Sequence, residues 1–261
     1  MYSGRDIEAN EAREDGDRVM TEKNVDIKTA DGSMPTTIVH PDSGGPFPVI
    51  LYLMDAPGIR PAFLDMARRL AAAGYYVMTP NLYYRNLPVA PFKFGDPEEM
   101  KRMRALIPTV TVPRVVADAK SMLDYAKTDK AADPKRVGTA GFCMGGKLAL
   151  GVAQAYPDVV KAAASLHGGR LVTDQPDSPH RNVDKIKAEL YFGWAEVDET
   201  APKEVIPDLE QALKAAGVTY KIDFMAGAKH GYTMADLPPY HKEAAEAHWR
   251  ALFDLFKRKL S

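Results

Sequence analysis

The sequence has little cysteine, no long hydrophobic run and no excess of either sign of charge. Cys143 is the only cysteine among 261 residues, which excludes an internal disulfide and a cysteine-rich zinc site. The 34 basic and 35 acidic residues are interspersed and give a net charge of -1. No basic surface for nucleic acid and no membrane-binding stripe is therefore predicted, and we expect a small-molecule partner held in a pocket.

The N-terminal 22 residues lack apolar periodicity. Acidic residues stand where a signal peptide needs an apolar core, and no stretch of the chain approaches membrane-spanning length. We expect a polar arm over residues 1–22, a single domain over residues 23–261 and a cytoplasmic location, which the lone cysteine also favours. The sequence leaves the oligomeric state open.

Hydrophobic residues make up 46% of the chain, which is enough for one large core. Apolar strand-like runs alternate with amphipathic helical stretches, beginning with a hairpin over residues 25–40. Further strands are expected over residues 49–54, 75–79, 137–140, 162–167, 189–194 and 220–225, and helices over 61–73, 115–127, from 147 onward, over 207–216 and at the C-terminal end. This order predicts an α/β fold with a mostly parallel, doubly wound sheet covered by helices on both faces. The proline-rich segment 86–113 is typical of a lid or binding loop.

The stretch over residues 136–150 carries the clearest chemical signal. Gly141 and Gly145 flank Cys143 at minus two and plus two, which is the pattern of a nucleophile elbow with cysteine in place of serine. Such a turn has no room for a Cβ at the flanking positions, and it puts the sulfur at a helix N-terminus that favours the thiolate. The amide of Met144 would face a developing oxyanion. A buried, inert cysteine is the alternative, and the two glycines count against it.

A thiol nucleophile needs a base within hydrogen-bond reach, and the base needs a third group to orient it. In a doubly wound sheet these groups come from the carboxyl ends of strands. Apart from His40 at the end of the predicted hairpin, only His167 and His230 stand at predicted strand ends. His180 lies in a loop, and solvated positions are expected for His241 and His248 on the last helix.

His230 is the preferred base because Gly231 lets its loop approach closely. His167 adjoins the elbow strand and either lines the pocket or is packed there. Asp198 and Glu196 share one loop, and Asp198 is preferred as the orienting acid because it lies deeper in that loop. The order of nucleophile, acid and histidine along the chain is that of α/β-hydrolases.

Three motifs together resemble the dienelactone hydrolase family, whose members are also called carboxymethylenebutenolidases. They occur in the order Gly141-Phe-Cys-Met-Gly-Gly146, Asp198-Glu-Thr-Ala-Pro202 and His230-Gly-Tyr232, and the resemblance covers about residues 23 to 258. It implies an α/β-hydrolase fold without a large separate cap domain, and a Cys-His-Asp triad in the residues already selected. It also implies hydrolysis of a lactone or small carboxylic ester through a thioester, with no cofactor and no metal.

The resemblance assigns two residues after the first long strand. Asp55 stands where the family usually carries a glutamate near the nucleophile, and Ala56 would supply a second oxyanion amide beside that of Met144. The side chain of Asp55 is shorter than glutamate. It is therefore open whether this carboxylate reaches the thiol or caps the turn that precedes Pro57 and Gly58.

Substrate charge is where the sequence departs most from the family pattern. Dienelactones carry a free carboxylate, which the family holds with two arginines. Arg85 matches the first position or is a surface arginine, and Met234 occupies the second. Losing one guanidinium removes a charge-assisted hydrogen bond worth roughly 1.5 to 3 kcal/mol. An adaptable apolar and aromatic wall would replace it, formed by Met234, Tyr83, Tyr84 and Tyr232. We expect neutral or bulkier aromatic substrates, unless a residue such as Arg170 takes over the role of the missing arginine.

Two other functions stay open on the sequence alone. A general carboxylesterase or thioesterase would use the same triad. A catalytically idle α/β-hydrolase fold could serve as a binding protein, and it would keep the pocket without needing all three motifs. The presence of all three motifs favours an enzyme.

Overall fold

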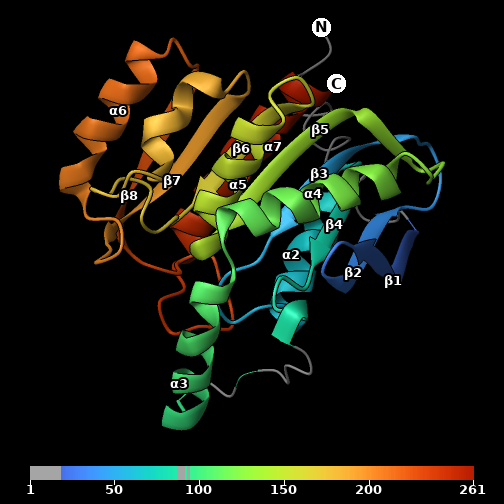
Figure 1. Ribbon diagram of the computed structural model, residues 1–261, viewed down its shortest axis with the longest axis horizontal. Coiled ribbons are helices and arrows are strands. Elements are labelled where there is room, and N and C mark those ends of the chain that lie inside the picture. The colour runs from blue at the N-terminus through green and yellow to red at the C-terminus, as the bar shows by residue number, and fades with distance from the viewer. Residues whose placement is uncertain (1–18, 87–91, 93–94) are drawn as a thin grey trace, which may run out of the picture.

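An eight-stranded sheet forms the centre of the molecule, and the computed structural model describes it within residues 19–86, 92 and 95–261 (Figure 1). The strands are β1 Met20–Thr29, β2 Gly32–Pro41, β3 Phe47–Leu53, β4 Tyr76–Pro80, β5 Ala132–Phe142, β6 Val160–Leu166, β7 Glu189–Val197 and β8 Tyr220–Lys229. Their order is β1-β2-β4-β3-β5-β6-β7-β8. Only the β1–β2 and β2–β4 pairs are antiparallel, so the sheet from β4 to β8 is parallel.

The parallel strands are covered on both faces, as their continuous apolar sequences require. Every residue of β3 and β4 is buried. Helices cover the sheet because parallel strands need long crossover connections, which put a helix on one face or the other. The helices are α2 Pro61–Ala72, α3 Pro97–Leu106, α4 Val112–Ala126, α5 Met144–Ala155, α6 Ile206–Ala215 and α7 Lys242–Leu260.

Figure 1 shows α4 and α5 in front of the sheet, with α2 and α7 behind it. Short 3₁₀ segments connect several elements, over Tyr84–Asn86, Ile107–Thr109, Pro179–Lys185 and Lys203–Val205. Local sequence explains where α2 lies: it starts at Pro61, whose missing N–H costs nothing in a first turn, and Gly74 follows its end with φ of +95°. The helix α3 extends away from the body of the sheet in Figure 1.

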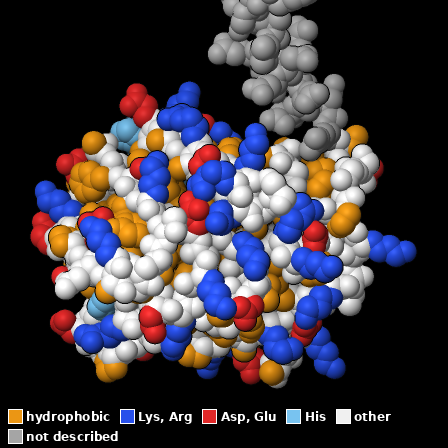
Figure 2. Space-filling view, turned by 90° about the horizontal axis from the view of Figure 1, so that it is seen from above, with side chains coloured by type: hydrophobic (Ala, Val, Ile, Leu, Met, Phe, Trp, Pro, Cys, Tyr) orange, Lys and Arg blue, Asp and Glu red, His pale blue; other side chains and the backbone are white. Residues whose placement is uncertain are grey.

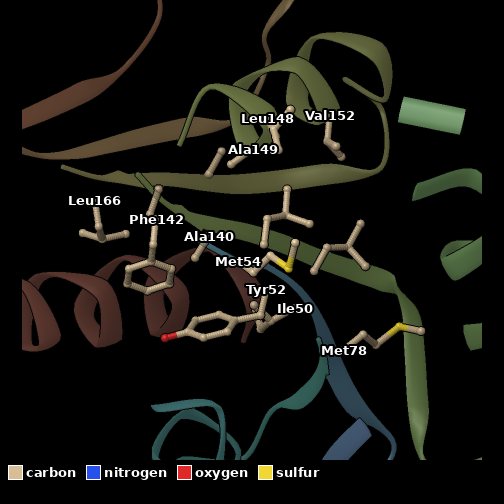
Figure 3. Close-up of a cluster of buried hydrophobic side chains, with 14 of the residues drawn as sticks. Ile50, Tyr52, Met54, Met78, Ala140, Phe142, Leu148, Ala149, Val152 and Leu166 are labelled. Carbon is tan, nitrogen blue, oxygen red and sulfur yellow. The ribbon is translucent and has the colours of Figure 1, made fainter. Parts of the chain in front are cut away.

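Three buried aromatic rings pack together where α2, β3 and β5 meet. The rings of Tyr52, Phe63 and Phe142 lie 4.9 to 5.7 Å apart, in tilted and edge-on arrangements that aromatic rings favour. On the other side of β5, apolar side chains of α5 fill the second layer. Figure 3 shows both layers, with Leu148 and Val152 on one side of β5 and Phe142 and Tyr52 on the other. Each such buried side chain contributes about 1.5 to 3 kcal/mol, so the core fixes the strand ends that carry the site.

The predicted doubly wound, mostly parallel α/β sheet is confirmed, and the described residues contain no separate cap domain. Strand β1 begins at Met20, earlier than the predicted hairpin and within the predicted arm of residues 1–22. Residues 1–18 of that arm lie outside the described residues, as do 87–91 and 93–94 of the predicted lid segment. The lid and the division into arm and single domain stay predictions.

The surface seen in Figure 2 carries basic and acidic side chains across the same face. This distribution agrees with the near-zero net charge of the sequence. Within the part of the chain that the structure describes, no helix is both long enough and apolar enough to cross a membrane.

Candidate active site

Cys143 lies at the apex of a tight turn between β5 and α5, half-buried and with φ of +53° and ψ of -118°. A Cβ on Gly141 would lie 1.9 Å from the carbonyl oxygen of Gly145, and a Cβ on Gly145 would lie 2.4 Å from the carbonyl oxygen of Leu53. Neither position therefore accepts any other residue without a shift of the backbone. Positive φ at a cysteine is strained, and such strain is typical of nucleophile elbows.

The turn is fixed to the neighbouring strand end. The Cys143 amide donates to the carbonyl of Leu166 at 3.1 Å, and the Gly169 amide donates to the carbonyl of Cys143 at 3.3 Å. Met144 is the first residue of α5, and the amide of a first helical residue has no partner within its helix. A helix N-terminus with a free amide favours negative charge beside it, on a thiolate or on an oxyanion.

His230 follows β8 and approaches the sulfur directly. Its Nε2 lies 3.0 Å from the Sγ of Cys143, although 87 residues separate the two in sequence. The His230 amide donates to the carbonyl of Val197 at 3.0 Å, which ties this loop to the end of β7. Gly231 has φ of +86°, a value that glycine adopts without strain. The chain can thus turn sharply right after the imidazole.

Asp198 is the carboxylate that reaches His230. Its Oδ2 lies 2.6 Å from Nδ1 of His230, which makes Nδ1–H the donor and leaves Nε2 facing the sulfur. The other oxygen, Oδ1, accepts from the amide and the hydroxyl of Thr200 at 2.8 and 2.7 Å and from the Ala201 amide at 3.2 Å. Glu196 is exposed and accepts instead from the amide of Gly227.

These contacts set the charges of the pair. Burial lowers the pKa of His230, but hydrogen bonds and the negative charges of Asp198 and Cys143 outweigh it and raise that pKa from 6.5 to about 10. Burial raises the pKa of the Asp198 carboxyl, but the hydrogen bonds from His230 and Thr200 and the charge of His230 bring it below 3.8. An ionised carboxylate therefore stands behind an imidazole that holds its proton firmly.

His167 is buried and packs against the imidazole ring of His230. Its ring centroid lies 5.2 Å from that of His230, edge-on, and only 1% of the residue is exposed. Nε2 of His167 lies 2.7 Å from the hydroxyl of Thr233, while its Nδ1 has no partner among the described residues. Full burial, with the charge of His230 second, holds the pKa of His167 well below 6.5. Of the two predicted possibilities, the structure places His167 as a packed, neutral ring.

Asp55 pairs with an arginine that the sequence analysis did not select. Its two carboxylate oxygens accept from Nη1 and Nη2 of Arg60 at 2.7 and 2.9 Å. The neighbouring turn is closed by a backbone bond from the Gly58 amide to the Asp55 carbonyl at 3.1 Å. The carbonyl of Ala56 accepts from the Tyr83 hydroxyl at 2.8 Å, and that hydroxyl lies 3.8 Å from the sulfur of Met144. Ala56 and Met144 are thus held beside one phenol.

Arg85 is occupied by two carboxylates. Its Nε donates to Asp31 at 2.6 Å, and its two terminal nitrogens donate to Asp118 at 2.8 and 2.9 Å. The hydroxyl of Tyr84 donates to the same Asp118 at 2.8 Å and lies 2.8 Å from the hydroxyl of Thr29. The structure therefore places Arg85 and Tyr84 in a network that joins the β1–β2 turn to α4.

All four residues of the expected apolar and aromatic wall are buried, since Tyr83, Tyr84, Tyr232 and Met234 are at most 5% exposed. Tyr232 and Met234 are both fully buried, and the Tyr232 ring lies 5.3 Å from that of His167 and 6.0 Å from that of His248. The expectation that His248 sits on a solvated face is wrong, because His248 is fully buried on the side of α7 that packs against the sheet, where its ring meets that of Phe142. The helix turns that position inward together with Trp249. His241 precedes the helix and accepts from the Ala244 amide at 3.2 Å as its N-cap.

Sequence comparison places this site in a known family. A family model described as "Dienelactone hydrolase family" matches residues 34–260 of the chain. The chain belongs to the dienelactone hydrolase family. It is accordingly a hydrolase acting on ester bonds, as the sequence analysis expected.

Relatives and solved structures agree with this family. A protein of Methylorubrum extorquens named "Putative carboxymethylenebutenolidase" is 31% identical over 90% of this chain and 80% of its own length. A Synechocystis protein of the same name is 30% identical over 90% of this chain and 99% of its own length. The crystal structure of a "Putative Dienelactone Hydrolase" from Klebsiella pneumoniae covers 92% of this chain and 99% of its own, with a TM-score of 0.80 and 24% identity. That structural likeness shows the fold.

Some residues of this dienelactone hydrolase site escaped the sequence analysis. Thr200 and Thr233 fix Asp198 and His167 through their hydroxyls, and Arg60 binds Asp55. Thr200 had a local signal, because an aspartate often bonds the amide two residues later. Thr233 and Arg60 had none. Within the described residues, no group of three or more His, Cys, Asp or Glu side chains is arranged to hold a metal ion.

Proposed function

We propose that this enzyme hydrolyses lactones or small carboxylic esters through a thioester on Cys143, with His230 as base and acid and Asp198 as the orienting carboxylate. One observation carries the proposal: Sγ, the imidazole and the carboxylate form a continuous chain with contacts of 3.0 and 2.6 Å. Such a chain matches the geometry that a nucleophile, its base and its orienting group require.

In the first half-reaction Nε2 of His230 takes the thiol proton of Cys143, the sulfur attacks the ester carbonyl carbon, and the carbonyl oxygen becomes an oxyanion. In this mechanism the amide of Met144, at the first residue of α5, donates to that oxygen, and the amide of Ala56 is the second donor. Collapse of the tetrahedral intermediate breaks the bond to the alkoxide, which takes a proton from Nε2 of His230. The products of this step are a thioester and an alcohol, which stays attached when the substrate is a lactone.

In the second half-reaction water enters the position that the alcohol occupied. His230 Nε2 takes a proton from the water as it attacks the thioester carbonyl. The second tetrahedral intermediate then releases the carboxylic acid and restores Cys143. Asp198 keeps its hydrogen bond to Nδ1 throughout, so the imidazole presents the same nitrogen in both halves.

Neutral substrates fit this site better than carboxylate-bearing ones. Arg85 already satisfies Asp31 and Asp118, and position 234 holds a buried methionine instead of a second arginine. Neither family position for holding a substrate carboxylate therefore offers a free guanidinium. Tyr83 is only 1% exposed and donates its hydroxyl to the carbonyl of Ala56, so it supports the loop of the proposed oxyanion donors from inside the protein.

The two alternative functions are weighed by the same geometry. A general carboxylesterase or thioesterase would use the identical triad, and the substrate alone separates it from a lactonase. An idle binding protein has no need for an imidazole 3.0 Å from a sulfur or for a carboxylate 2.6 Å behind it. The ordered contacts therefore favour catalysis over binding.

Intact-mass measurement tests the proposed nucleophile. The protein is incubated with a panel of lactones and aryl esters, and we expect an acyl adduct that peptide mapping places on Cys143. Cys143→Ala should lose the adduct and the turnover while keeping its unfolding midpoint, since it removes little buried volume. Cys143→Ser should also be slow, because a hydroxyl has a far higher pKa than a thiol. Near-normal esterase activity in Cys143→Ala would refute the cysteine mechanism.

Substrate charge is tested by comparing kcat/KM for a dienelactone and for its methyl ester. The free acid lacks one charge-assisted hydrogen bond, which costs it about one to two decades of affinity, so we expect the methyl ester to be the better substrate. Arg85→Gln should leave this ratio unchanged, because its guanidinium is held by Asp31 and Asp118. A strong preference for the free acid would contradict the proposal and would make Arg170 the next arginine to replace.

A further inference from the structure

Arg60 joins two loops of the site that are far apart in the sequence. Its side chain lies between Asp55, in the loop after β3, and Asp236, in the loop after His230. Five hydrogen bonds leave its guanidinium: two to Asp55 at 2.7 and 2.9 Å, two to Asp236 at 2.6 and 3.2 Å, and one to the Gly58 carbonyl at 3.0 Å. A guanidinium has five N–H donors, so Arg60 is fully used.

The two carboxylates differ in their surroundings. The side chains of Arg60 and Asp55 are 9% and 3% exposed, whereas that of Asp236 is 35% exposed. The inner pair is needed simply because a buried carboxylate without a partner is costly. The outer pair has no such requirement, since water can reach Asp236. Its bidentate geometry therefore points to a role other than neutralisation.

Each end of this bridge stands next to a reacting group. Asp55 directly precedes Ala56, whose amide is the second oxyanion donor of the proposed mechanism. Asp236 lies six residues after His230, and the segment between them is tied back on itself by bonds from the Met234 amide to the Gly231 carbonyl and from the Leu237 amide to the Met234 carbonyl, at 3.0 and 3.1 Å. A shift of Arg60 would thus change the spacing between the oxyanion donor and the imidazole.

We propose that Arg60 is a positioning residue, which holds the Ala56 amide at the correct distance from the His230 loop through its two-sided bridge to Asp55 and Asp236. The inference rests on the proposed thioester mechanism, because only an oxyanion gives the Ala56 amide a task. Losing either ion pair of Arg60, the inner one with Asp55 or the outer one with Asp236, leaves the Cys143 sulfur, the His230 imidazole and Asp198 in contact. The loss misplaces one oxyanion donor, and so it slows ester attack more than it weakens substrate binding.

Asp236→Asn tests the outer ion pair by itself. This variant keeps the buried Arg60–Asp55 pair, so the protein should fold, and it removes the negative charge that aligns the Nε and Nη2 groups of Arg60. Asp65→Asn is the matched control: Asp65 also accepts at 2.6 Å from an arginine of α2, Arg68, but that exposed pair lies on the outer surface of the helix. Both variants are compared with the parent chain in ester hydrolysis and in alkylation by iodoacetamide.

The two reactions separate the oxyanion site from the nucleophile. Iodoacetamide reacts when the sulfur forms a bond to carbon and iodide leaves, and no oxyanion develops. We expect Asp236→Asn to lower kcat for an activated ester by about 10- to 100-fold, with KM and the alkylation rate of Cys143 nearly unchanged. Asp65→Asn should change none of the three. Arg60→Lys should repeat the loss of kcat, because an ammonium cannot form both bidentate pairs.

Two results would overturn the proposal. One is an unchanged kcat in Asp236→Asn, which would make the outer arm a surface ion pair. The other is an equal loss of hydrolysis and alkylation, which would mean that the bridge acts on the Cys143–His230 pair itself. Failure of the underlying mechanism looks different, since the parent chain would then show no acyl adduct on Cys143 at all.

Discussion

Two strand ends of this molecule each carry a histidine, and the two imidazoles differ in almost every other respect. His167 follows β6 and His230 follows β8, and their rings lie 5.2 Å apart. His230 contacts a carboxylate and a thiol, which raise its pKa to about 10. His167 contacts a threonine hydroxyl and is fully buried, which holds its pKa well below 6.5.

This contrast shows that neighbours, and not the residue type, assign the role. An imidazole with a carboxylate behind it can carry positive charge and move a proton between sulfur and substrate. An imidazole enclosed by apolar and aromatic side chains stays neutral, and it can only fill space and orient a hydroxyl. Both histidines stand at strand ends in the sequence, so the distinction comes from what the fold brings to each.

Replacing each of the two histidines in turn should give the largest difference in kcat/KM between paired variants. His230→Gln should lower kcat/KM by a factor on the order of 10⁶, because it removes the proposed base and proton donor of both half-reactions. His167→Gln should lower kcat/KM by less than about tenfold, which corresponds to about 1.4 kcal/mol of activation free energy, because the His167 ring only packs against His230. Steady-state kinetics with one activated ester measure both. Equal losses in the two variants would mean that the contrast between them is false.

Removing the carboxylate behind His230 should make the two histidines more alike. Asp198→Asn is expected to lower kcat by about 10⁴-fold, because the imidazole loses its fixed orientation. The pKa of His230 should fall from about 10 as well, since the hydrogen bond and negative charge that raise it are gone. NMR titration of the imidazole reports that pKa. Glu196→Gln, on the same loop, serves as the control and should leave both values unchanged.

The reverse ranking of these two carboxylates would have a specific meaning. A large loss in Glu196→Gln with a small loss in Asp198→Asn would show that the loop rearranges when substrate binds. The contacts of Asp198 with Thr200 and Ala201 oppose such a rearrangement.

The smallest effect is on stability, and its pH dependence has opposite signs for the two histidines. His230 binds its proton more tightly when folded, so its contribution is complete below pH 6.5 and is lost as the pH rises toward about 10. His167 stays neutral when folded, so stability falls as the pH drops below 6.5 and the unfolded chain takes up the proton. Each slope is at most about 1.4 kcal/mol per pH unit.

Urea unfolding of the parent chain and of the two glutamine variants, below, near and above pH 6.5, measures these slopes. His230→Gln should be flatter than the parent on the alkaline side, and His167→Gln should be flatter on the acid side. His248, whose pKa burial lowers to about 3, keeps part of the acid slope in both variants. Slopes of the same sign for the two histidines would contradict the assigned protonation states.

Local features of the sequence were enough to predict the tight turn at Cys143 and the class of fold. The glycines at 141 and 145 predicted a turn with no room for a Cβ, and the close contacts at both positions confirm it. The alternation of apolar runs and amphipathic helices predicted the doubly wound sheet, because periodicity is read from neighbouring residues. That sheet brings the carboxyl ends of its parallel strands to one edge. This placement reduced the candidates for the base from six histidines to two.

The tertiary structure alone decided which side chains meet. Arg60 and Asp236 are 176 residues apart, and no local pattern links them. Arg85 matched a substrate-binding position in sequence but is paired with Asp31 and Asp118, and His248 proved to be fully buried. Ion pairs and burial depend on distances between elements, which the packing of helices on the sheet sets. A sequence determines each side chain's chemistry, and the fold determines which partner satisfies it.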